Sequence, residues 1–355
     1  MPEPLLSVRD LTVHFETEDG IVKAVDGVSY DVYPGKALGI VGESGSGKSV
    51  SSLTVMGLTR AKNARISGEV IFEGRDLLTA SDSDLRSIRG NEIAMIFQDP
   101  LSSLHPYYKV GWQLVEAIRV HNPDTSKQAA RQRAIELLDM VDIPEPQERV
   151  DAYPHEFSGG MRQRAMIAMA LANDPKLLIA DEPTTALDVT VQAQILGLIR
   201  RLQEELDTAV VMISHDLGVI AETAQEVAVM YAGRIVEQAS TTTIFNAPEH
   251  PYTWGLIGSI PRLDTPRDFE LVPIPGRPPS LINLPTGCSF HPRCPYVRER
   301  HKRVDPSLEP VPGQPDHQVA CLLESDTRKR IWSELQEGKD PESVRAAVAL
   351  EDTPA

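Results

Sequence analysis

The sequence has 355 residues, more than the roughly 250–300 at which a single hydrophobic core stops growing, so we expect about two domains. Its formal net charge of -16 argues against nucleic acid and anionic lipid as direct partners, since both favour surplus Lys and Arg. No apolar stretch approaches about 18 residues and the N-terminus has no signal-peptide pattern, so we expect a cytoplasmic chain that meets a membrane only through another protein.

The first predicted elements are short strands. Residues 6–40 alternate apolar and polar positions, with Asp19-Gly20 and Pro34-Gly35 as turn signals between the runs. This pattern predicts a meander of strands that ends in a buried strand at residues 37–41.

A phosphate-binding loop follows this buried strand. The run Gly42-Glu43-Ser44-Gly45-Ser46-Gly47-Lys48-Ser49 fits GxxxxGK[ST] without a mismatch, and a helix-compatible run follows at 50–56. The glycines let backbone N–H groups converge on phosphate oxygens, and Lys48 can reach the β- and γ-phosphates. The Ser49 hydroxyl can complete a Mg²⁺ shell. The loop therefore predicts a nucleoside triphosphate site.

The middle of the chain alternates between strand and helix patterns. Further strands are predicted at residues 66–74, 93–97, 177–180 and 209–213. Helical spacing dominates residues 110–172, which predicts a helical insert, and an amphipathic helix is predicted at 191–205. Strands that alternate with helices predict an α/β fold with a parallel sheet.

Two short motifs add polar groups to the phosphate loop. Asp181 and Glu182 end the apolar strand at 177–180, where Asp181 can hold Mg²⁺ through water and Glu182 can polarise the attacking water. Ser158-Gly159-Gly160 opens a predicted helix whose first N–H groups favour an anion. SGG alone is common in loops, but its place between the phosphate loop and the Asp-Glu pair predicts a second phosphate contact.

The composition changes near the C-terminus. After Glu237 the chain becomes rich in proline, so we place a domain boundary near residue 240, with domains at 1–240 and 241–336. Residues 337–355 are polar and acidic with a weakly helical centre, and we expect a mobile tail.

Taken in order, these motifs resemble the nucleotide-binding subunit of ATP-binding-cassette (ABC) transporters. The resemblance covers roughly residues 5–238 and also includes Phe15, Gln98, Ala186-Leu187-Asp188 and His215. It implies a RecA-like parallel core sheet, an antiparallel β subdomain and a helical subdomain at about 99–172, followed by a small proline-rich C-terminal extension.

The resemblance also implies a role for each matched residue. Phe15 would stack on adenine, although the family more often has Tyr there. Gln98 would sense the γ-phosphate and touch Mg²⁺, and His215 would hold the γ-phosphate, so that Glu182, His215 and Gln98 form the catalytic set. The implied ATP site comprises Phe15, Gly42, Ser44, Gly45, Ser46, Gly47, Lys48, Ser49, Gln98, Asp181 and His215. The implied Mg²⁺ ligands are Ser49, Gln98 and Asp181.

Two subunits are implied by the same family pattern. Ser158, Gly159 and Gly160 would contact the ATP bound to the other subunit, and Asp188 would lie at the dimer seam. Two chains packed head to tail would bury two ATP molecules, and hydrolysis would release the pair.

Finer features are similar to the ATPases of oligopeptide/dipeptide permeases. These are the run at residues 98–106, Phe157 in place of the usual Leu, and the segments at 250–253 and 274–279. In length and run of motifs the chain looks like the D-type member of a D/F pair. The resemblance implies an F-type ATPase as heterodimer partner, two transmembrane permease subunits, indirectly a substrate-binding protein, and a peripheral position on the cytoplasmic face of the membrane.

Other functions remain to be weighed against this one. Relatives handle nickel, glutathione or oligosaccharides as well as peptides, and the ATPase sequence does not choose the cargo. A soluble ABC ATPase of DNA repair or translation would carry two cassettes or a long coiled coil and favour basic surfaces, which this sequence does not show. A purely regulatory module would tolerate loss of Glu182 or His215, and both are present.

Three cysteines lie in the C-terminal extension, which suits a local site better than a disulfide framework. Many relatives have four cysteines there that can bind a [4Fe–4S] cluster. Cys288, Cys294 and Cys321 match three of them, and His301 stands where the fourth is expected. A cluster, a Cys₃His zinc site and no metal at all are the three alternatives.

Overall fold

The structure is a computed structural model that describes residues 3–98, 103–185, 187–260 and 274–347. Parts of three sequence features lie outside these residues: positions 99–102 after Gln98, Ala186 before Leu187-Asp188, and positions 348–355 of the expected tail. None of the described helices is long and apolar enough to cross a membrane.

The alternating N-terminal segments form an antiparallel sheet with strand order β2-β1-β4-β5. The strands are Leu6–Thr17 (β1), Gly20–Val32 (β2), Ala64–Phe72 (β4) and Arg75–Asp76 (β5). β1 and β2 form a hairpin whose register runs from Leu6 opposite Val32 to Thr17 opposite Gly20. Alternate residues of β1 are buried, as expected for an antiparallel sheet with one face on the core.

A larger sheet has the strand order β11-β12-β10-β9-β3-β8-β7-β6. Its strands are Ala37–Val41 (β3), Ile93–Ile96 (β6), Leu177–Asp181 (β7), Ala209–Ser214 (β8), Glu226–Tyr231 (β9), Arg234–Ser240 (β10), Glu309–Val311 (β11) and Gln314–Val319 (β12). The pairs from β6 to β9 are parallel, and the pairs that involve β10 are antiparallel. Every residue of β3, β6, β7 and β8 is buried, which is typical of a parallel sheet covered on both faces.

The parallel sheet separates two hydrophobic cores. Leu38 and Ile40 of β3 face the core shared with the antiparallel sheet, whereas Ala37 and Val41 face the core shared with the helices. Successive strand residues point to opposite faces, so one five-residue strand serves both cores. The carboxyl ends of β3 and β7 thereby reach the same sheet edge, where the phosphate loop begins.

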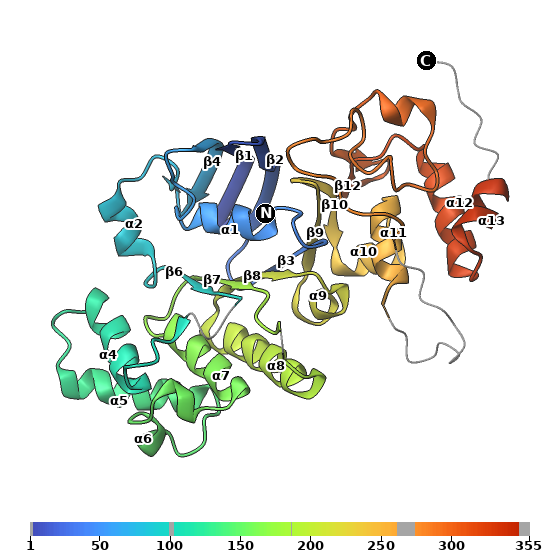
Figure 1. The fold of residues 1–355 in the computed structure, drawn as a ribbon. Helices are drawn as coiled ribbons and strands as arrows, with labels where there is room; N and C mark the ends of the chain where they lie inside the picture. Colours follow the sequence, from blue (N-terminus) through green and yellow to red (C-terminus); the bar gives the residue numbers. More distant parts are fainter. Residues whose placement is uncertain (1–2, 99–102, 186, 261–273, 348–355) are drawn as a thin grey trace.

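The helices lie in groups around this sheet. The first part of the chain has Lys48–Val55 (α1) and Asp82–Ile88 (α2), the helical insert has Val110–His121 (α4), Lys127–Met140 (α5), Pro146–Arg149 (α6) and Gly159–Ala170 (α7), and the core adds Val189–Leu206 (α8) and Leu217–Thr223 (α9). Figure 1 shows α4, α5 and α6 gathered away from the antiparallel sheet, with the parallel strands between the two groups. The fold class predicted from the sequence is confirmed.

The C-terminal extension continues the large sheet across the expected boundary at residue 240. Strand β12 pairs with β10, with Glu237 opposite Val319. The extension also has the helices Thr241–Asn246 (α10), Pro251–Gly258 (α11), Ser325–Gln336 (α12) and Pro341–Ala347 (α13). Helix α13 corrects the expected tail for these residues, because its Val344 is fully buried in the core.

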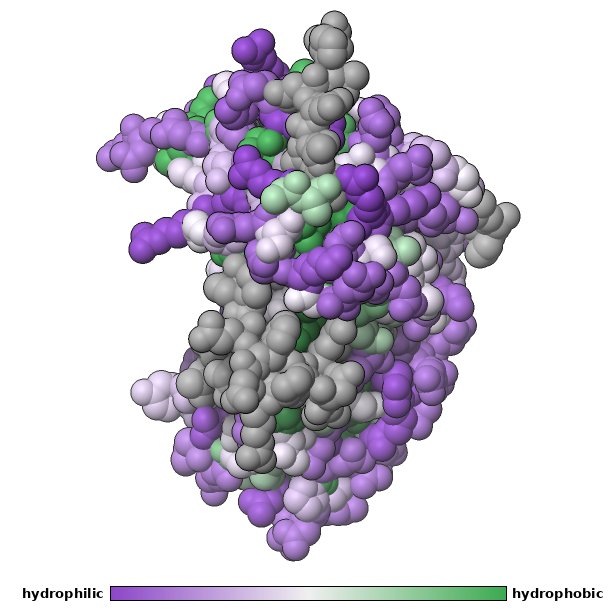
Figure 2. All heavy atoms as spheres, turned by 90° about the vertical axis from the view of Figure 1, so that its right-hand side faces the viewer, coloured by the Kyte–Doolittle hydropathy of each residue, from purple (hydrophilic) through white to green (hydrophobic). Residues whose placement is uncertain are grey.

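The outer face of this extension is mostly polar. In Figure 2 the coloured atoms on this side of the molecule are mainly hydrophilic, and apolar residues show between them only in small groups. The extension therefore buries its aromatic residues inward, among them Tyr252, Phe290 and Tyr296.

Candidate nucleotide-binding site

The phosphate loop is shaped by glycines that no other residue could replace. Gly45 and Gly47 have φ values of 79° and 103°, in the left-handed region. A Cβ at Gly47 would lie 2.1 Å from the Ala24 carbonyl oxygen, and one at Gly42 would lie 2.1 Å from the Met230 carbonyl oxygen. Helix α1 begins directly after Gly47 with no side-chain cap, so its first N–H groups are available to an anion.

Lys48 lies across the mouth of this loop. Its Nζ donates to the carbonyl oxygens of Gly42, at 2.7 Å, and Glu43, at 3.0 Å, and the residue is 4% exposed. Burial lowers the pKa of the Lys48 amine, while the nearby carboxylates, Glu182 first, oppose that shift. The amine thus stands where it can reach phosphate oxygens.

Two of the expected Mg²⁺ ligands, Ser49 of the phosphate loop and Asp181 of β7, are in contact with each other. Ser49 Oγ donates to Asp181 Oδ1 at 2.9 Å, at the end of β7. Burial raises the pKa of Asp181; the Ser49 hydrogen bond opposes this and the Glu182 charge adds to it. A cation at this point would lower the cost of burying that carboxylate. The residues present therefore fit Mg²⁺ and a triphosphate.

The three catalytic candidates converge on one carboxylate oxygen. Glu182 Oε2 accepts a hydrogen bond from Gln98 Nε2 at 3.0 Å and lies 3.3 Å from His215 Nδ1. The Thr185 hydroxyl donates to the same oxygen at 2.9 Å, a contact that sequence reasoning missed. Glu182 itself has a φ of 47°, a strained conformation that is common at functional sites.

Phe15 lies at a distance along the chain from these groups, on β1. Its ring is partly buried against the core under the antiparallel sheet. The adenine contact stays a prediction, since a partly buried ring serves a core as well as a ligand. Ser44, by contrast, lies on the exposed side of the phosphate loop.

The Ser-Gly-Gly motif and Asp188 face one open hollow of about 550 Å³. Ser158 caps α7 by accepting from the Met161 N–H, and Asp188 caps α8 by accepting from the N–H groups of Thr190 and Val191. A Cβ at Gly159 would meet nothing within 4 Å. This surface is therefore open for contact with a ligand or a second subunit.

The three cysteines of the C-terminal extension and His301 do not form a metal site among the residues that the structure describes. Among residues 3–98, 103–185, 187–260 and 274–347, no three His, Cys, Asp or Glu side chains converge as ligands. Burial raises the pKa of the Cys294 thiol, and neighbouring Cys321 adds to that shift. His301 is buried, and its Nε2 has no hydrogen-bond partner among the residues that the structure describes. The donor types suit a cluster or zinc, but their arrangement does not fit either.

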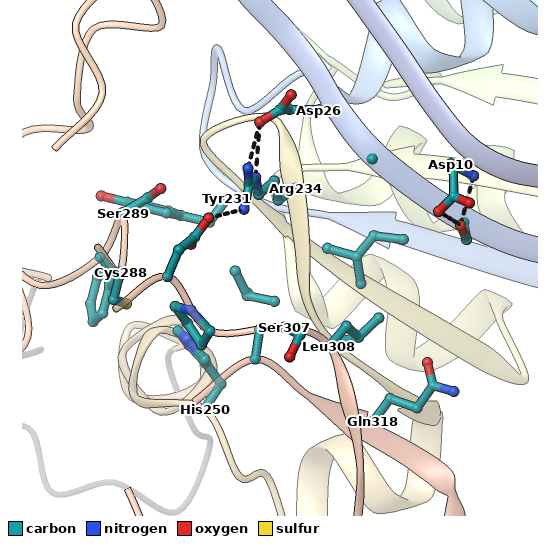
Figure 3. Close-up of a pocket in the computed structure, with 18 of the residues that line it drawn as sticks. Asp10, Asp26, Tyr231, Arg234, His250, Cys288, Ser289, Ser307, Leu308 and Gln318 are labelled. Carbon is teal, nitrogen blue, oxygen red and sulfur yellow. Dashed lines mark hydrogen bonds and ion pairs between the residues drawn. The ribbon is translucent and has the colours of Figure 1, made fainter. Parts of the chain in front are cut away.

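A second cavity, of about 500 Å³, lies between the antiparallel sheet, β10 and the C-terminal extension. Figure 3 shows Asp26 bound to Arg234 at its edge, with Tyr231 next to Arg234 and with His250 and Cys288 farther from this ion pair. Arg234 also pairs with Asp305, so the acidic residues near it are neutralised. The cavity lies apart from the phosphate loop's glycine cradle.

Comparison with known proteins agrees with this geometry. Residues 25–185 match the family model described as ABC transporter, and residues 236–300 match the model of the oligopeptide/dipeptide transporter C-terminal region. The oligopeptide transport ATP-binding protein OppD of Bacillus subtilis is 52% identical over 96% of this chain and 93% of its own length. The chain belongs to the ABC transporter family.

The chain also resembles a longer relative and a cassette whose structure has been solved. The OppD of Mycobacterium tuberculosis is 51% identical over 90% of this chain, but the chain spans only 52% of that relative. The dimeric bacterial ABC transporter cassette MJ0796 superposes with a TM-score of 0.60 at 27% identity, over 66% of this chain and 98% of that one.

Proposed function

We propose that this protein is the ATP-hydrolysing subunit of an ABC importer that powers uptake of oligopeptides or dipeptides through a membrane permease. The observation that carries the proposal is the convergence of Gln98, Thr185 and His215 on Glu182, beside Lys48 and the Ser49–Asp181 pair. The names of the relatives, oligopeptide and dipeptide transport ATP-binding proteins, support the cargo class.

Hydrolysis follows from the roles of these side chains. Lys48 and the α1 N-terminus bind the phosphates, and Mg²⁺ held by Ser49, Asp181 and Gln98 would neutralise charge that develops on them. Three groups hold Glu182 Oε2, and the described residues give Oε1 no hydrogen bond. Glu182 Oε1 therefore accepts a proton from water as the water oxygen bonds to the γ-phosphorus. The bond to the bridging oxygen breaks and leaves ADP and phosphate.

A second cassette completes the site in this proposal. Ser158, Gly159 and Gly160 border an open hollow and contact the ATP held by the partner, with Asp188 at the seam. A related cassette, MJ0796, has been solved as a dimer bound to ADP and Pi, which supports such an arrangement. We propose an F-type ATPase as the partner.

The permease contact is assigned to the helical insert. Tyr107, Tyr108 and Trp112 are exposed there, Tyr107 to 83%, and the rings of Tyr108 and Trp112 stack with centroids 4.3 Å apart. Exposed aromatic side chains that cluster are typical of interfaces. A short permease helix packing on this aromatic patch would hold the protein on the cytoplasmic face of the membrane.

The cysteine site remains a separate proposal with three outcomes. A [4Fe–4S] cluster or zinc would require Cys288, Cys294, Cys321 and His301 to draw closer together than they lie here. The unpartnered Nε2 of His301 supports a ligand role. Iron and sulfide in equal amounts in anaerobically purified protein would establish the cluster, stoichiometric zinc the alternative, and metal-free protein neither.

Transport tests the main proposal. The purified chain, assembled with its permease subunits and partner ATPase in vesicles, should take up short peptides only when ATP and Mg²⁺ are on its side of the membrane. The same assembly with Glu182→Gln serves as the control for leakage. Uptake of a metal or sugar instead of peptides would overturn the cargo, and crosslinks from the helical insert only to soluble proteins would overturn the transport role.

A further inference from the structure

The C-terminal extension makes an ion pair with the phosphate loop, in which the arginine is buried and the glutamate is partly exposed. Arg293 Nη1 lies 2.6 Å from Glu43 Oε2, and its Nη2 lies 3.0 Å from Glu43 Oε1. The Arg293 side chain is only 4% exposed. The two residues are 250 positions apart in the chain, so this bidentate pair is a tertiary contact between two regions of the fold.

Arg293 is itself held in place by residues of the extension and by Tyr231 of β9. Its Nε donates to the Pro275 carbonyl oxygen at 2.8 Å, and its guanidinium lies 5.8 Å from the Tyr231 ring centroid and 6.0 Å from that of Phe290. Burial alone would lower the pKa of Arg293, but Glu43 and Tyr231 outweigh burial and raise it. The guanidinium is thus a fixed positive charge behind the loop.

The backbone N–H, the backbone carbonyl and the carboxylate of Glu43 all take part in hydrogen bonds. Its N–H donates to the Tyr252 hydroxyl at 2.8 Å, its carbonyl accepts from Lys48 Nζ at 3.0 Å, and its carboxylate is bound by Arg293. Two of these three contacts come from the C-terminal extension, since Tyr252 lies in α11. The extension therefore sets the path of the loop's second residue.

We propose that Arg293 is a positioning residue for ATP binding, which acts by holding Glu43 and by neutralising its carboxylate beside the phosphate site. Without Arg293, a carboxylate in the loop repels the triphosphate and the loop loses its fixed path. The C-terminal extension is then part of the nucleotide site. This inference rests on the proposed ATP binding, which Lys48→Ala tests separately.

The experiment measures the Kd for Mg·ATP of the full-length chain and the KM and kcat of the assembled transporter. Arg293→Met should raise the Kd by roughly 10- to 100-fold, which corresponds to the loss of hydrogen bonds to a charged group. The substitution should also raise KM more than it lowers kcat. The Kd of Arg293→Lys should lie between those of wild type and Arg293→Met, because an ammonium group keeps the charge but cannot make the two parallel hydrogen bonds of a guanidinium. Glu43→Gln combined with Arg293→Met should recover most of the lost affinity, since the unpaired carboxylate is gone.

The control is a second Arg–Glu pair of the extension, Arg328 with Glu249, in which both partners are buried. Arg328 Nε lies 2.5 Å from Glu249 Oε2, and both side chains are as buried as Arg293. Arg328→Met should lower thermal stability without changing the Kd. Wild-type affinity in Arg293→Met, no recovery in the double variant, or an equal loss in Arg328→Met would each overturn the inference. If wild type binds ATP and Lys48→Ala does not, such a result leaves the proposed function intact.

Discussion

At the scale of single residues, we assign nucleotide binding and water activation to different neighbouring side chains. Lys48 and Ser49 lie at the start of α1, where we propose that they bind phosphate and metal, whereas we propose that Glu182, one residue beyond Asp181, activates water. Glu182 has a positive φ of 47°, and Asp181 is buried at the strand end. Binding and turnover should therefore respond to different substitutions.

Glu182→Gln should keep ATP binding and lose turnover by roughly 100- to 10,000-fold, the usual contribution of a positioned general base. Gln can still accept hydrogen bonds but cannot take a proton from water. Lys48→Ala should lose binding as well. Steady-state phosphate release and nucleotide titration of the assembled complex measure both effects. Glu204→Gln on the exposed side of α8 is the control, and full hydrolysis by Glu182→Gln would refute the assignment.

His250 should make the C-terminal extension sensitive to acid. The residue is 1% exposed at the start of α11, where its Nδ1 accepts from the Tyr252 N–H, and burial, aided by the charge of Arg328, lowers its pKa to about 3. Between this value and the ordinary pKa of about 6.5, the unfolded chain binds a proton that the folded chain does not. Stability from this group is thus present above about pH 6.5 and is lost as the pH falls.

The loss for this one site should be about 2 kcal/mol of unfolding free energy between pH 7 and pH 5. His250→Asn keeps an acceptor for the Tyr252 N–H without titrating, so its stability should fall less over that interval. Urea unfolding followed by the fluorescence of Trp254 and Trp332, both in the extension, gives the comparison. Equal losses in the two proteins would show that His250 does not titrate on unfolding.

At the scale of elements, the N-termini of α7 and α8 lie at the hollow that we propose as the contact with a second cassette. Ser158 caps α7 and Asp188 caps α8, and both lie at one hollow. Gln163 of α7 donates to the Pro183 carbonyl oxygen at 2.5 Å, next to Glu182, so a shift of α7 reaches the catalytic carboxylate directly. A partner that touches the Ser-Gly-Gly motif can therefore influence hydrolysis.

Gly159→Ala tests the role of this hollow. Within one chain the added methyl meets nothing within 4 Å, so folding should be unchanged, but the methyl should block the close approach of a partner's nucleotide. In a Glu182→Gln background with ATP, sedimentation should show association of two cassettes that Gly159→Ala abolishes. Gly197→Ala, on an exposed part of α8 with equally free space, should associate normally. Equal association of both variants would remove Gly159 from the interface.

At the scale of the whole molecule, the protein has three surfaces to which we assign different contacts. The hollow at α7 and α8 is proposed to meet a second cassette, and the aromatic patch is exposed on the helical insert. The C-terminal extension contacts the phosphate loop through Arg293 and Glu43. Transport needs a link between these contacts, because hydrolysis and cargo passage occur in different subunits.

The aromatic patch should be needed for the complex and dispensable for the nucleotide. Tyr107→Ser combined with Trp112→Ser removes two exposed rings, so the chain should bind ATP normally but no longer co-purify with permease subunits. Val304→Ser, an exposed apolar residue of the C-terminal extension, is the control. Unchanged co-purification of the double variant would move the docking site elsewhere.

Contiguous residues made much of this protein predictable from its sequence. The phosphate loop, the Asp181-Glu182 pair and the strand–helix alternation depend on spacing within a few positions, where backbone geometry follows from residue type. The α/β class and the two sheets were predicted on that basis and are confirmed. Strands β11 and β12, at one end of the large sheet, were not predicted, because their short, proline-containing segments carry little periodic signal.

Only the tertiary structure decided how distant residues meet. Gln98 and His215 reach Glu182 because β6, β7 and β8 lie side by side in the sheet, whereas Thr185 contacts it from three residues along the chain. Arg293 reaches Glu43 because the extension folds back behind the phosphate loop. The same folding left the three cysteines and His301 unconverged, although their order in the sequence favoured a metal site. Spacing along a chain determines local geometry, whereas contacts between residues far apart in the chain depend on packing that residue order alone does not express.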